Sequence, residues 1–211
     1  TRQFGTSGIE ATMGVAGYYN ATLASSDVYL AGYTSGVFPG QPNLSGTDSF
    51  LRKYVDHGTL VDEAWTRQFG ADATDFGLCV AADASGAWVG GTAEGAIQGA
   101  SYSGSRDGYV RRYDLDGAVV WTDQFGSSSY DSVNAIVLGA SSVFVAGYTE
   151  GVLPNQTSSG GNDAFLRKYD PSLGSELWTR QFGTGWAGND MASAVDAEGN
   201  IYLAGWTDRA F

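Results

Sequence analysis

W-T-R-Q-F-G at residues 178–183 is the stretch that decides the fold, because it recurs almost unchanged along the chain. It stands as W-T-R-Q-F-G at 65–70 and as W-T-D-Q-F-G at 121–126, and the chain opens with T-R-Q-F-G at 1–5. Successive tryptophans are 56 and 57 residues apart. A constant period of this length indicates a repeat protein in which each unit is one supersecondary structure.

Two further motifs recur in step with the first. One is Y-L-A-G-Y-T at 29–34, with V-A-G-Y-T at 145–149, Y-L-A-G-W-T at 202–207 and a degenerate W-V-G-G-T-A at 88–93. The other is D-S-F-L-R-K-Y at 48–54, with D-G-Y-V-R-R-Y at 107–113 and D-A-F-L-R-K-Y at 163–169. A fourth β-rich segment opens each unit at an acidic residue. Each unit therefore contains four short segments, which we name a (from the acid), b (A-G-Y-T), c (D-x-F-L-R-K-Y) and d (W-T-R-Q-F-G).

Four strands per unit predict an all-β fold, a β-propeller of four-stranded antiparallel blades with strand a innermost and strand d outermost. Helical repeats would show a 3.6-residue period, which this sequence lacks, and solenoid coils have shorter repeats. The predicted units are an outer strand of a preceding blade at 1–6, complete blades at 9–70, 74–126 and 130–183, and a partial blade at 189–211. Three blades do not close a ring, so we expect a fragment, or half of an assembly that another chain completes.

The connections between segments differ in kind. Asp and Gly between a and b and between c and d, as in D-A-S-G at 83–86 and D-L-D-G at 114–117, indicate tight hairpins. The b-to-c connection is long and constant in length, and an apolar residue stands four places into it each time. Such regularity predicts a packed anchor for the loop. The anchor residues are Phe38, Ile97, Leu153 and Phe211.

G-N-I-Y-L-A-G-W-T, N-D-A-F-L-R-K-Y-D and W-T-R-Q-F-G make the whole chain resemble the bacterial β-propeller repeat family often called SBBP. The resemblance implies a propeller, commonly seven-bladed, in exported or cell-surface bacterial proteins. It implies no shared reaction. Two departures are a longer a-to-b stretch around residues 18–26 and the loss of the A-G-Y-T form in the second unit.

Composition excludes several classes of partner. The formal net charge of -12 repels phosphate backbones, and no run of Lys and Arg offsets it, so nucleic acid is not expected to bind. No apolar run approaches the roughly 20 residues that span a bilayer, so membrane insertion is not expected. The single cysteine cannot form an internal disulfide and leaves the compartment open.

Catalytic candidates are few. Cys79 occupies a position that holds Gly or Ala in the other units, which indicates a buried, inert thiol. His57 is the only histidine and lies in a c-to-d connection, without the partners that a zinc site or a catalytic triad requires. The tryptophans of strand d are expected to pack between neighbouring blades, and the arginines and aspartates of strand c to form ion pairs. These residues are Trp65, Trp121, Trp178, Arg52, Arg111, Arg167, Asp48, Asp107 and Asp163.

The acids that open strand a allow two interpretations. Symmetry would gather them around the mouth of a central channel, where a carboxylate ring could hold a hard cation such as calcium. Alternatively, each caps backbone amides of its own loop. The residues are Glu10, Asp75, Asp131 and Asp190. Three asparagines, Asn20, Asn43 and Asn155, also match the glycosylation sequon, which matters only in an organism that glycosylates asparagine.

These features predict a non-catalytic binding or scaffolding module, extracellular or on the cell surface, whose partner is a protein or glycan surface. No cofactor is expected. The ligand face is assigned to the long b-to-c and d-to-a loops, with the unrepeated aromatics Tyr102, Tyr130 and Trp186 as ligand-binding residues. Two alternatives stay open. The chain could belong to a propeller enzyme, a hydrolase or quinoprotein-like, whose site lies in other blades, or it could be a structural subunit that pairs through open edge strands.

Overall fold

The computed structural model describes residues 3–185, 190–196 and 200–207, and these residues form strands and loops without a helix. They include no long apolar helix of the kind that could cross a membrane. The fourteen strands are β1 (Glu10–Asn20), β2 (Ser25–Thr34), β3 (Asp48–Asp56), β4 (Val61–Phe69), β5 (Asp75–Asp83), β6 (Gly86–Ala93), β7 (Asp107–Tyr113), β8 (Val119–Phe125), β9 (Asp131–Gly139), β10 (Ser142–Thr149), β11 (Asp163–Tyr169), β12 (Glu176–Phe182), β13 (Asp190–Asp196) and β14 (Tyr202–Thr207).

Each repeat unit folds as one antiparallel sheet. β1–β4, β5–β8 and β9–β12 form three four-stranded sheets in which strands adjacent in sequence are adjacent in space, and β13 pairs with β14. The four segments a to d of each unit thus become four consecutive strands, as the repeat predicts. The all-β class and the three four-stranded antiparallel sheets are therefore confirmed.

Local residues explain the hairpins. The connection between β7 and β8 turns because Asp114 Oδ1 accepts hydrogen bonds from the backbone N–H groups of Asp116 and Ala118, at 3.0 and 2.8 Å. Gly117 has a φ of 76°, a left-handed conformation that glycine adopts without steric cost. The first sheet has longer strands, and there Asn20 Oδ1 caps the turn by accepting from Thr22 N–H at 3.0 Å. Asp, Asn and Gly are thus placed where the chain must reverse.

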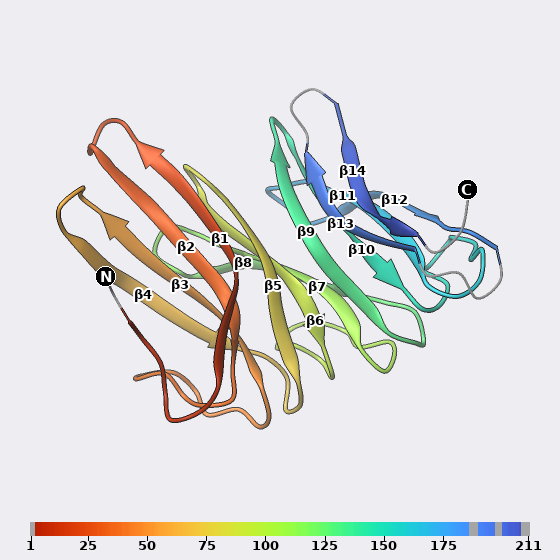
Figure 1. Cartoon of the computed structure of the whole chain (residues 1–211), viewed down its shortest axis with the longest axis horizontal. Helices are drawn as coiled ribbons and strands as arrows, with labels where there is room; N and C mark the ends of the chain where they lie inside the picture. Colours follow the sequence, from red (N-terminus) through yellow and green to blue (C-terminus); the bar gives the residue numbers. More distant parts are fainter. Residues whose placement is uncertain (1–2, 186–189, 197–199, 208–211) are drawn as a thin grey trace.

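The sheets lie side by side in sequence order, and their first strands are neighbours (Figure 1). β5 packs between β1 and β9, and β13 packs against β9. The sheets do not close on themselves. Two hydrophobic cores fill the spaces between the complete sheets: one contains Tyr29, Leu51 and Tyr109, and the next contains Trp88 and Phe165.

Trp65 and Trp121 of strand d pack between sheets, as predicted, whereas the ring of Trp178 lies 6.1 Å from Phe144 of its own sheet. The indole N–H of Trp65 donates to the carbonyl of Leu115 in the next sheet at 2.9 Å, and its ring centroid lies 6.2 Å from that of Tyr113. Trp121 repeats the arrangement with the carbonyl of Pro171 at 3.0 Å and a nearly parallel Tyr169 ring at 5.9 Å. Each of these two indoles thus ties its sheet to the c-to-d turn of the following one.

The arginine and aspartate of strand c do not pair with each other, so that prediction is wrong. In the third sheet, the Arg167 guanidinium lies 4.0 Å from the Phe125 ring centroid and binds Glu176 at 2.6 Å. Asp163 Oδ2 instead accepts from Gln181 Nε2 at 2.7 Å. The two residues lie four positions apart along an extended strand, so different neighbours reach them. Arg52 and Arg111 likewise lie over phenylalanine rings, and Asp48 and Asp107 accept from glutamines.

Residues 1–6 were predicted as an outer strand, but the described residues 3–6 form no strand. A strand needs a hydrogen-bonding neighbour, and no described strand runs beside this segment. Phe4 nevertheless lies edge-on to Phe50 with centroids 5.9 Å apart. Phe69 packs on Tyr109 of the next sheet in the same way, at 5.8 Å and 85°. The side chain therefore occupies the place of a preceding strand d although its backbone is unpaired.

Candidate functional site

One end of the sheets carries the long connections, and we name it the loop face. In the first sheet, Thr34 at the end of β2 lies opposite both Glu10, which opens β1, and Asp48, which opens β3. The same register holds in the other complete sheets. The b-to-c connections 35–47, 94–106 and 150–162 therefore emerge beside the d-to-a connections 70–74 and 126–130. Loops that a rigid sheet positions in this way commonly carry binding functions.

Each b-to-c loop is fixed by the predicted anchor. Phe38, Ile97 and Leu153 are each 1% exposed. The backbone N–H of the anchor donates to a strand d glutamine, for example from Ile97 to Gln124 Oε1 at 2.9 Å. The anchors are therefore confirmed, except for Phe211, which lies outside the described residues.

Tyr130 belongs to a half-buried aromatic row on the loop face. Its ring lies nearly parallel to that of Tyr148, with centroids 5.6 Å apart and planes inclined by 7°. The Arg106 guanidinium lies 5.3 Å from the Tyr130 centroid and 5.4 Å from that of Phe76. Phe76 in turn meets Tyr33 edge-on at 4.8 Å. These five side chains, which we name the aromatic row, join all three complete sheets.

Hydrogen bonds fix the charge state of the aromatic row. Glu94 Oε1 accepts from Arg106 Nε at 3.0 Å, and the guanidinium also reaches the Tyr130 hydroxyl at 3.5 Å. Burial alone would lower the pKa of Arg106, but these hydrogen bonds raise it. Burial, reinforced by Tyr130 and Glu150, raises the pKa of Tyr148. The row therefore places aromatic rings around the Arg106 cation, a surface suited to stacking on sugar rings or flat side chains.

The other predicted ligand residues do not join this row directly. Tyr102 is 42% exposed in the same loop as Arg106, and its hydroxyl donates to the Ser105 carbonyl at 2.8 Å. Trp186 lies outside the described residues. Tyr102 and Tyr130 are thus both on the loop face, as predicted.

The acids that open strand a cap their own loops, which was the second of the two interpretations. Asp75 and Asp131 are fully buried, and each accepts a backbone N–H four residues upstream at 2.7 Å, from Ala71 and Ser127. Asp190 likewise accepts the backbone N–H of Thr184, six residues upstream. Glu10 is less buried and accepts from the Thr6 hydroxyl of its own loop and from Thr34 Oγ1 of β2, the latter at 2.9 Å. Across residues 3–185, 190–196 and 200–207, no three His, Cys, Asp or Glu side chains gather as a metal cage.

Each buried acid of strand a lies next to a second carboxylate, that of the aspartate which opens strand c in the preceding sheet. A Cβ atom added to Gly126 would lie 2.5 Å from Asp107 Oδ1 and 2.6 Å from Asp131 Oδ2. The glycine of W-T-R-Q-F-G is therefore required because two carboxylates occupy the space of a side chain. The same pairs are Asp48 with Asp75 at Gly70 and Asp163 with Asp190 at Gly183. In all six aspartates, Oδ1 is buried without a hydrogen-bond partner.

Burial raises the pKa of four of these carboxyl groups. Burial raises the pKa of Asp75 to about 7, and the charge of Asp48 acts in the same direction. Burial also raises the pKa of Asp48, Asp107 and Asp131. None of the ion pairs between described residues includes these carboxylates, so no side-chain cation offsets the effect of burial on their pKa.

Cys79 and His57 show no catalytic environment. Cys79 packs against the third sheet, with Sγ 3.8 Å from the Val133 carbonyl, and burial raises the pKa of its thiol to about 12. Such a thiol is a poor nucleophile at neutral pH. His57 is exposed in the β3–β4 turn, at the end of the sheet opposite the loop face.

The sequon asparagines differ in exposure. Asn43 and Asn155 are exposed on b-to-c loops, and Asn155 has a φ of 60°. Asn20 is half-buried and its side chain caps a turn. Asn43 and Asn155 are therefore the more accessible of the three.

Sequence reasoning missed most of the aromatic row. Tyr33 and Tyr148 were assigned to the repeating A-G-Y-T motif, and Phe76 and Arg106 were not singled out. A signal was present, because Phe76 and Arg106 stand where the equivalent positions of the other units hold neither an aromatic nor an arginine. Residues that differ from their counterparts in the other units, at the end of the sheets with the long loops, therefore indicate the site.

Comparison with known proteins adds one relative. No protein-family model matches the chain. A protein named regulatory protein FlaEY, from Caulobacter vibrioides, is 31% identical over 198 residues, which covers 77% of this chain and 19% of that protein. The chain thus spans about a fifth of the length of this relative, to which it is similar over most of its own length.

Proposed function

We propose that the chain is part of a β-propeller and acts as a non-catalytic binding or scaffolding module outside the cell or on its surface. Support for the propeller comes from the four-stranded sheets stacked by their first strands, with strand d tryptophans between them. Support for a non-catalytic role comes from Cys79 and His57, neither of which has a catalytic partner among the described residues. The name of the relative, a regulatory protein, agrees with a role in binding.

The aromatic row is the observation that carries the proposal. It is half-exposed, three of its five residues (Phe76, Arg106 and Tyr130) depart from the repeat, and three sheets hold it in place. Tyr102 adds a separate exposed aromatic to the loop face, on the same loop as Arg106. The expected partner is a glycan or a protein surface that stacks on the rings and offers an acceptor to Arg106.

A glycan array tests this assignment. The wild-type chain is compared with a Tyr102→Ala/Tyr130→Ala variant and with Tyr19→Ala, a matched loss of an aromatic that is 62% exposed on β1, away from the loop face. We expect the double variant to lose binding and the Tyr19 variant to keep it. Equal binding by wild type and double variant contradicts the loop face, and loss in the Tyr19 variant moves the site to the extended first hairpin. An array without any binding contradicts a glycan ligand.

A further inference from the structure

The strand c arginines of the three complete sheets differ in their carboxylate partners. Arg52 lies 3.2 Å from Glu63 of its own sheet, and Arg167 lies 2.6 Å from Glu176 in the same relative position. In both sheets the glutamate pairs with the tyrosine two residues after the arginine. Arg167 also lies 3.5 Å from Asp123 of the preceding sheet. A carboxylate on this guanidinium is therefore a repeated feature.

Arg111, the corresponding arginine of the second sheet, has neither partner. Val119 pairs with Tyr113 where the other sheets have a glutamate, and Arg67 of the preceding sheet holds the position of Asp123. No ion pair between the described residues includes Arg111. Its side chain is 7% exposed, and its Nε and Nη1 atoms are buried without a hydrogen-bond partner. This cation is thus buried without the counter-charge that normally accompanies burial.

The tyrosines of strand c report the difference in local charge. Burial raises the pKa of Tyr113, and the charges of Arg111 and Arg67 both lower it. Burial raises the pKa of Tyr169 as well, but there Arg167 lowers it and the two carboxylate partners of that arginine raise it. The surroundings of Tyr113 are therefore the more positive of the two.

A pocket of about 360 Å³ lies beside Arg111, between the first and second sheets. Arg67 and Arg111 give it positive charge, and neither Asp nor Glu is among its lining residues. Gln98 adds a side-chain amide, and much of the remaining lining is apolar, including Phe69 and the exposed Val119. Pockets of this volume accept small organic molecules, and charged or polar groups within them fix the orientation of the ligand.

The other two sheets show how a carboxylate reaches this arginine. The side chains of Glu63 and Glu176 are 43% and 40% exposed while they bind their arginines, so the approach is from solvent. Each glutamate also accepts a hydrogen bond from a strand d threonine hydroxyl, at 2.7 and 2.6 Å. Thr122 holds the position of that threonine and pairs with Arg111 in the strand register. The second sheet therefore keeps both donors and lacks the glutamate.

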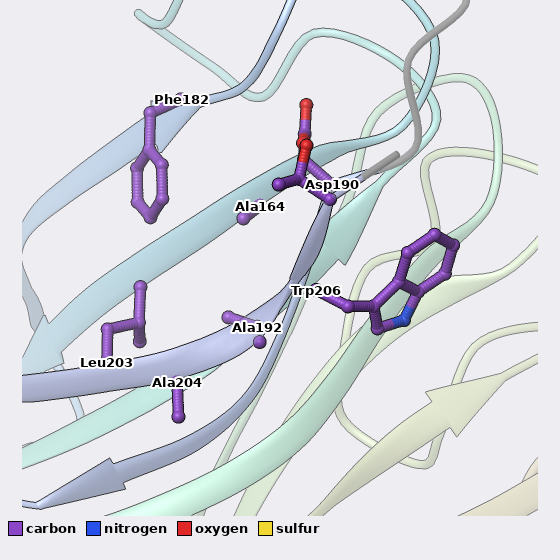
Figure 2. A pocket seen from close by; sticks show the side chains of 9 residues that line it. Ala164, Phe182, Asp190, Ala192, Leu203, Ala204 and Trp206 are labelled. Atoms are coloured by element: carbon purple, nitrogen blue, oxygen red, sulfur yellow. The ribbon is translucent and has the colours of Figure 1, made fainter. Parts of the chain in front are cut away.

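A hollow of about 250 Å³ beside β13 has the opposite charge and serves as a comparison (Figure 2). Phe182, Ala192 and Leu203 give it an apolar lining, and Asp190 is the charged residue that lines it. A negatively charged ligand would be repelled there. The character of the pocket beside Arg111 is therefore not common to the hollows of this protein.

We propose that the pocket beside Arg111 binds the carboxylate of a small organic acid that has an apolar body. The carboxylate accepts from Arg111 and Thr122, in the place that a glutamate side chain fills in the other two complete sheets. Arg67 adds a second positive charge, and the apolar body lies along the lining that includes Phe69. None of the lining residues belongs to the aromatic row, so the proposal does not depend on the function proposed for the loop face.

An NMR titration of the chain of residues 1–211 with phenylacetate tests the ligand class. We expect saturable shifts of the backbone amide signals of Phe69 and Val119, with a Kd on the order of 1 mM. Phenylacetamide has nearly the same shape without the charge and should bind at least about tenfold more weakly. Failure of phenylacetate to bind, or equally tight binding of phenylacetamide or inorganic phosphate, would overturn the proposal.

A variant locates the site. Val119→Glu restores the glutamate of the other sheets, and its carboxylate should occupy the pocket and weaken phenylacetate binding at least about tenfold. Leu173→Glu adds the same charge at an exposed aliphatic residue of the third sheet and should leave binding unchanged. Thermal melts check that both variants are folded. Unchanged binding by the folded Val119 variant, or equal losses in the two variants, would overturn the assignment of the ligand to Arg111.

Discussion

Replacing Trp121 by alanine removes a contact that joins two sheets. The indole lies 5.9 Å from the Tyr169 ring and donates to the Pro171 carbonyl at 3.0 Å, and Gly174 of the same turn packs against it. Replacing a fully buried tryptophan by alanine lowers the free energy of unfolding by about 3 to 5 kcal/mol. Because Trp121 keeps part of its surface exposed, we expect a loss of about 3 kcal/mol in the free energy of unfolding.

Trp178 is the matched control. It holds the same position in the third sheet, but its ring contact among the described residues is with Phe144 of its own sheet, at 6.1 Å. Trp178→Ala should therefore cost only about 1 kcal/mol, a value typical of a partly exposed aromatic pair. Urea unfolding followed by circular dichroism measures both. Equal losses in the two variants, or no loss for Trp121→Ala, would refute the assignment of this tryptophan to contact between sheets.

Three further predictions concern the buried groups. Asp75 has a folded pKa raised to about 7, so it binds a proton more tightly in the folded state; the resulting stability is present below about pH 4 and is lost as the pH rises through 7. Urea titrations at several pH values should show the unfolding free energy of the wild type falling between pH 4 and 8. Asp75→Asn should make this fall smaller, by at most about 4 kcal/mol over the range. Gly126→Ala should cost about 2 kcal/mol or more, because the new methyl group meets two carboxylate oxygens, whereas Gly17→Ala on the exposed face of β1 should be nearly neutral in thermal melts. Cys79 should react with a thiol reagent far more slowly than a free thiol at pH 8 and at the free-thiol rate in urea; fast labelling of the folded chain would contradict its burial.

The order and number of strands could be predicted from the sequence because the repeat supplies several copies of one pattern. Any assignment of Trp65 had to hold for Trp121 and Trp178, and only a packing role between units suits a residue that occurs once in each. The turns were equally clear, since Asp and Gly act locally at positions such as Asp114 and Gly117. The turn residues and the repeat were therefore sufficient to predict most of the strands and their order.

Contacts between units were harder to predict. The carboxylate pairs join residues of different sheets, such as Asp107 and Asp131, and no local pattern reports which acid meets which. The arginine of strand c was assigned to an aspartate because opposite charges attract, yet its position along the strand placed it over Phe125 in the case of Arg167. Burial and register decide such pairs, and both depend on how the sheets pack.

The candidate site was predicted at the level of the face and not of its residues. The loop face followed from the lengths of the connections, and Tyr102 and Tyr130 do lie there. The partners of Tyr130 come from another loop and from a different part of its own sheet, so single-sequence reasoning had no means to bring Arg106 and Tyr148 to it. The residues that gather on a face become evident only when the sheets are placed.

The central claim is that the repeat units stack through their first strands, and one cross-link tests it directly. The side chains of Cys79 on β5 and Val133 on β9 meet over Gly90, whose added Cβ would lie 2.8 Å from Cys79 Sγ and 2.6 Å from Val133 Cγ1. A Val133→Cys variant, refolded in a glutathione redox buffer, should form a disulfide between residues 79 and 133 within one chain, detected by non-reducing peptide mapping. Ser141→Cys, in an exposed turn, serves as the control and should not cross-link to Cys79. Free thiols in the Val133 variant, or the same degree of cross-linking in both variants, would contradict the stacking of the sheets.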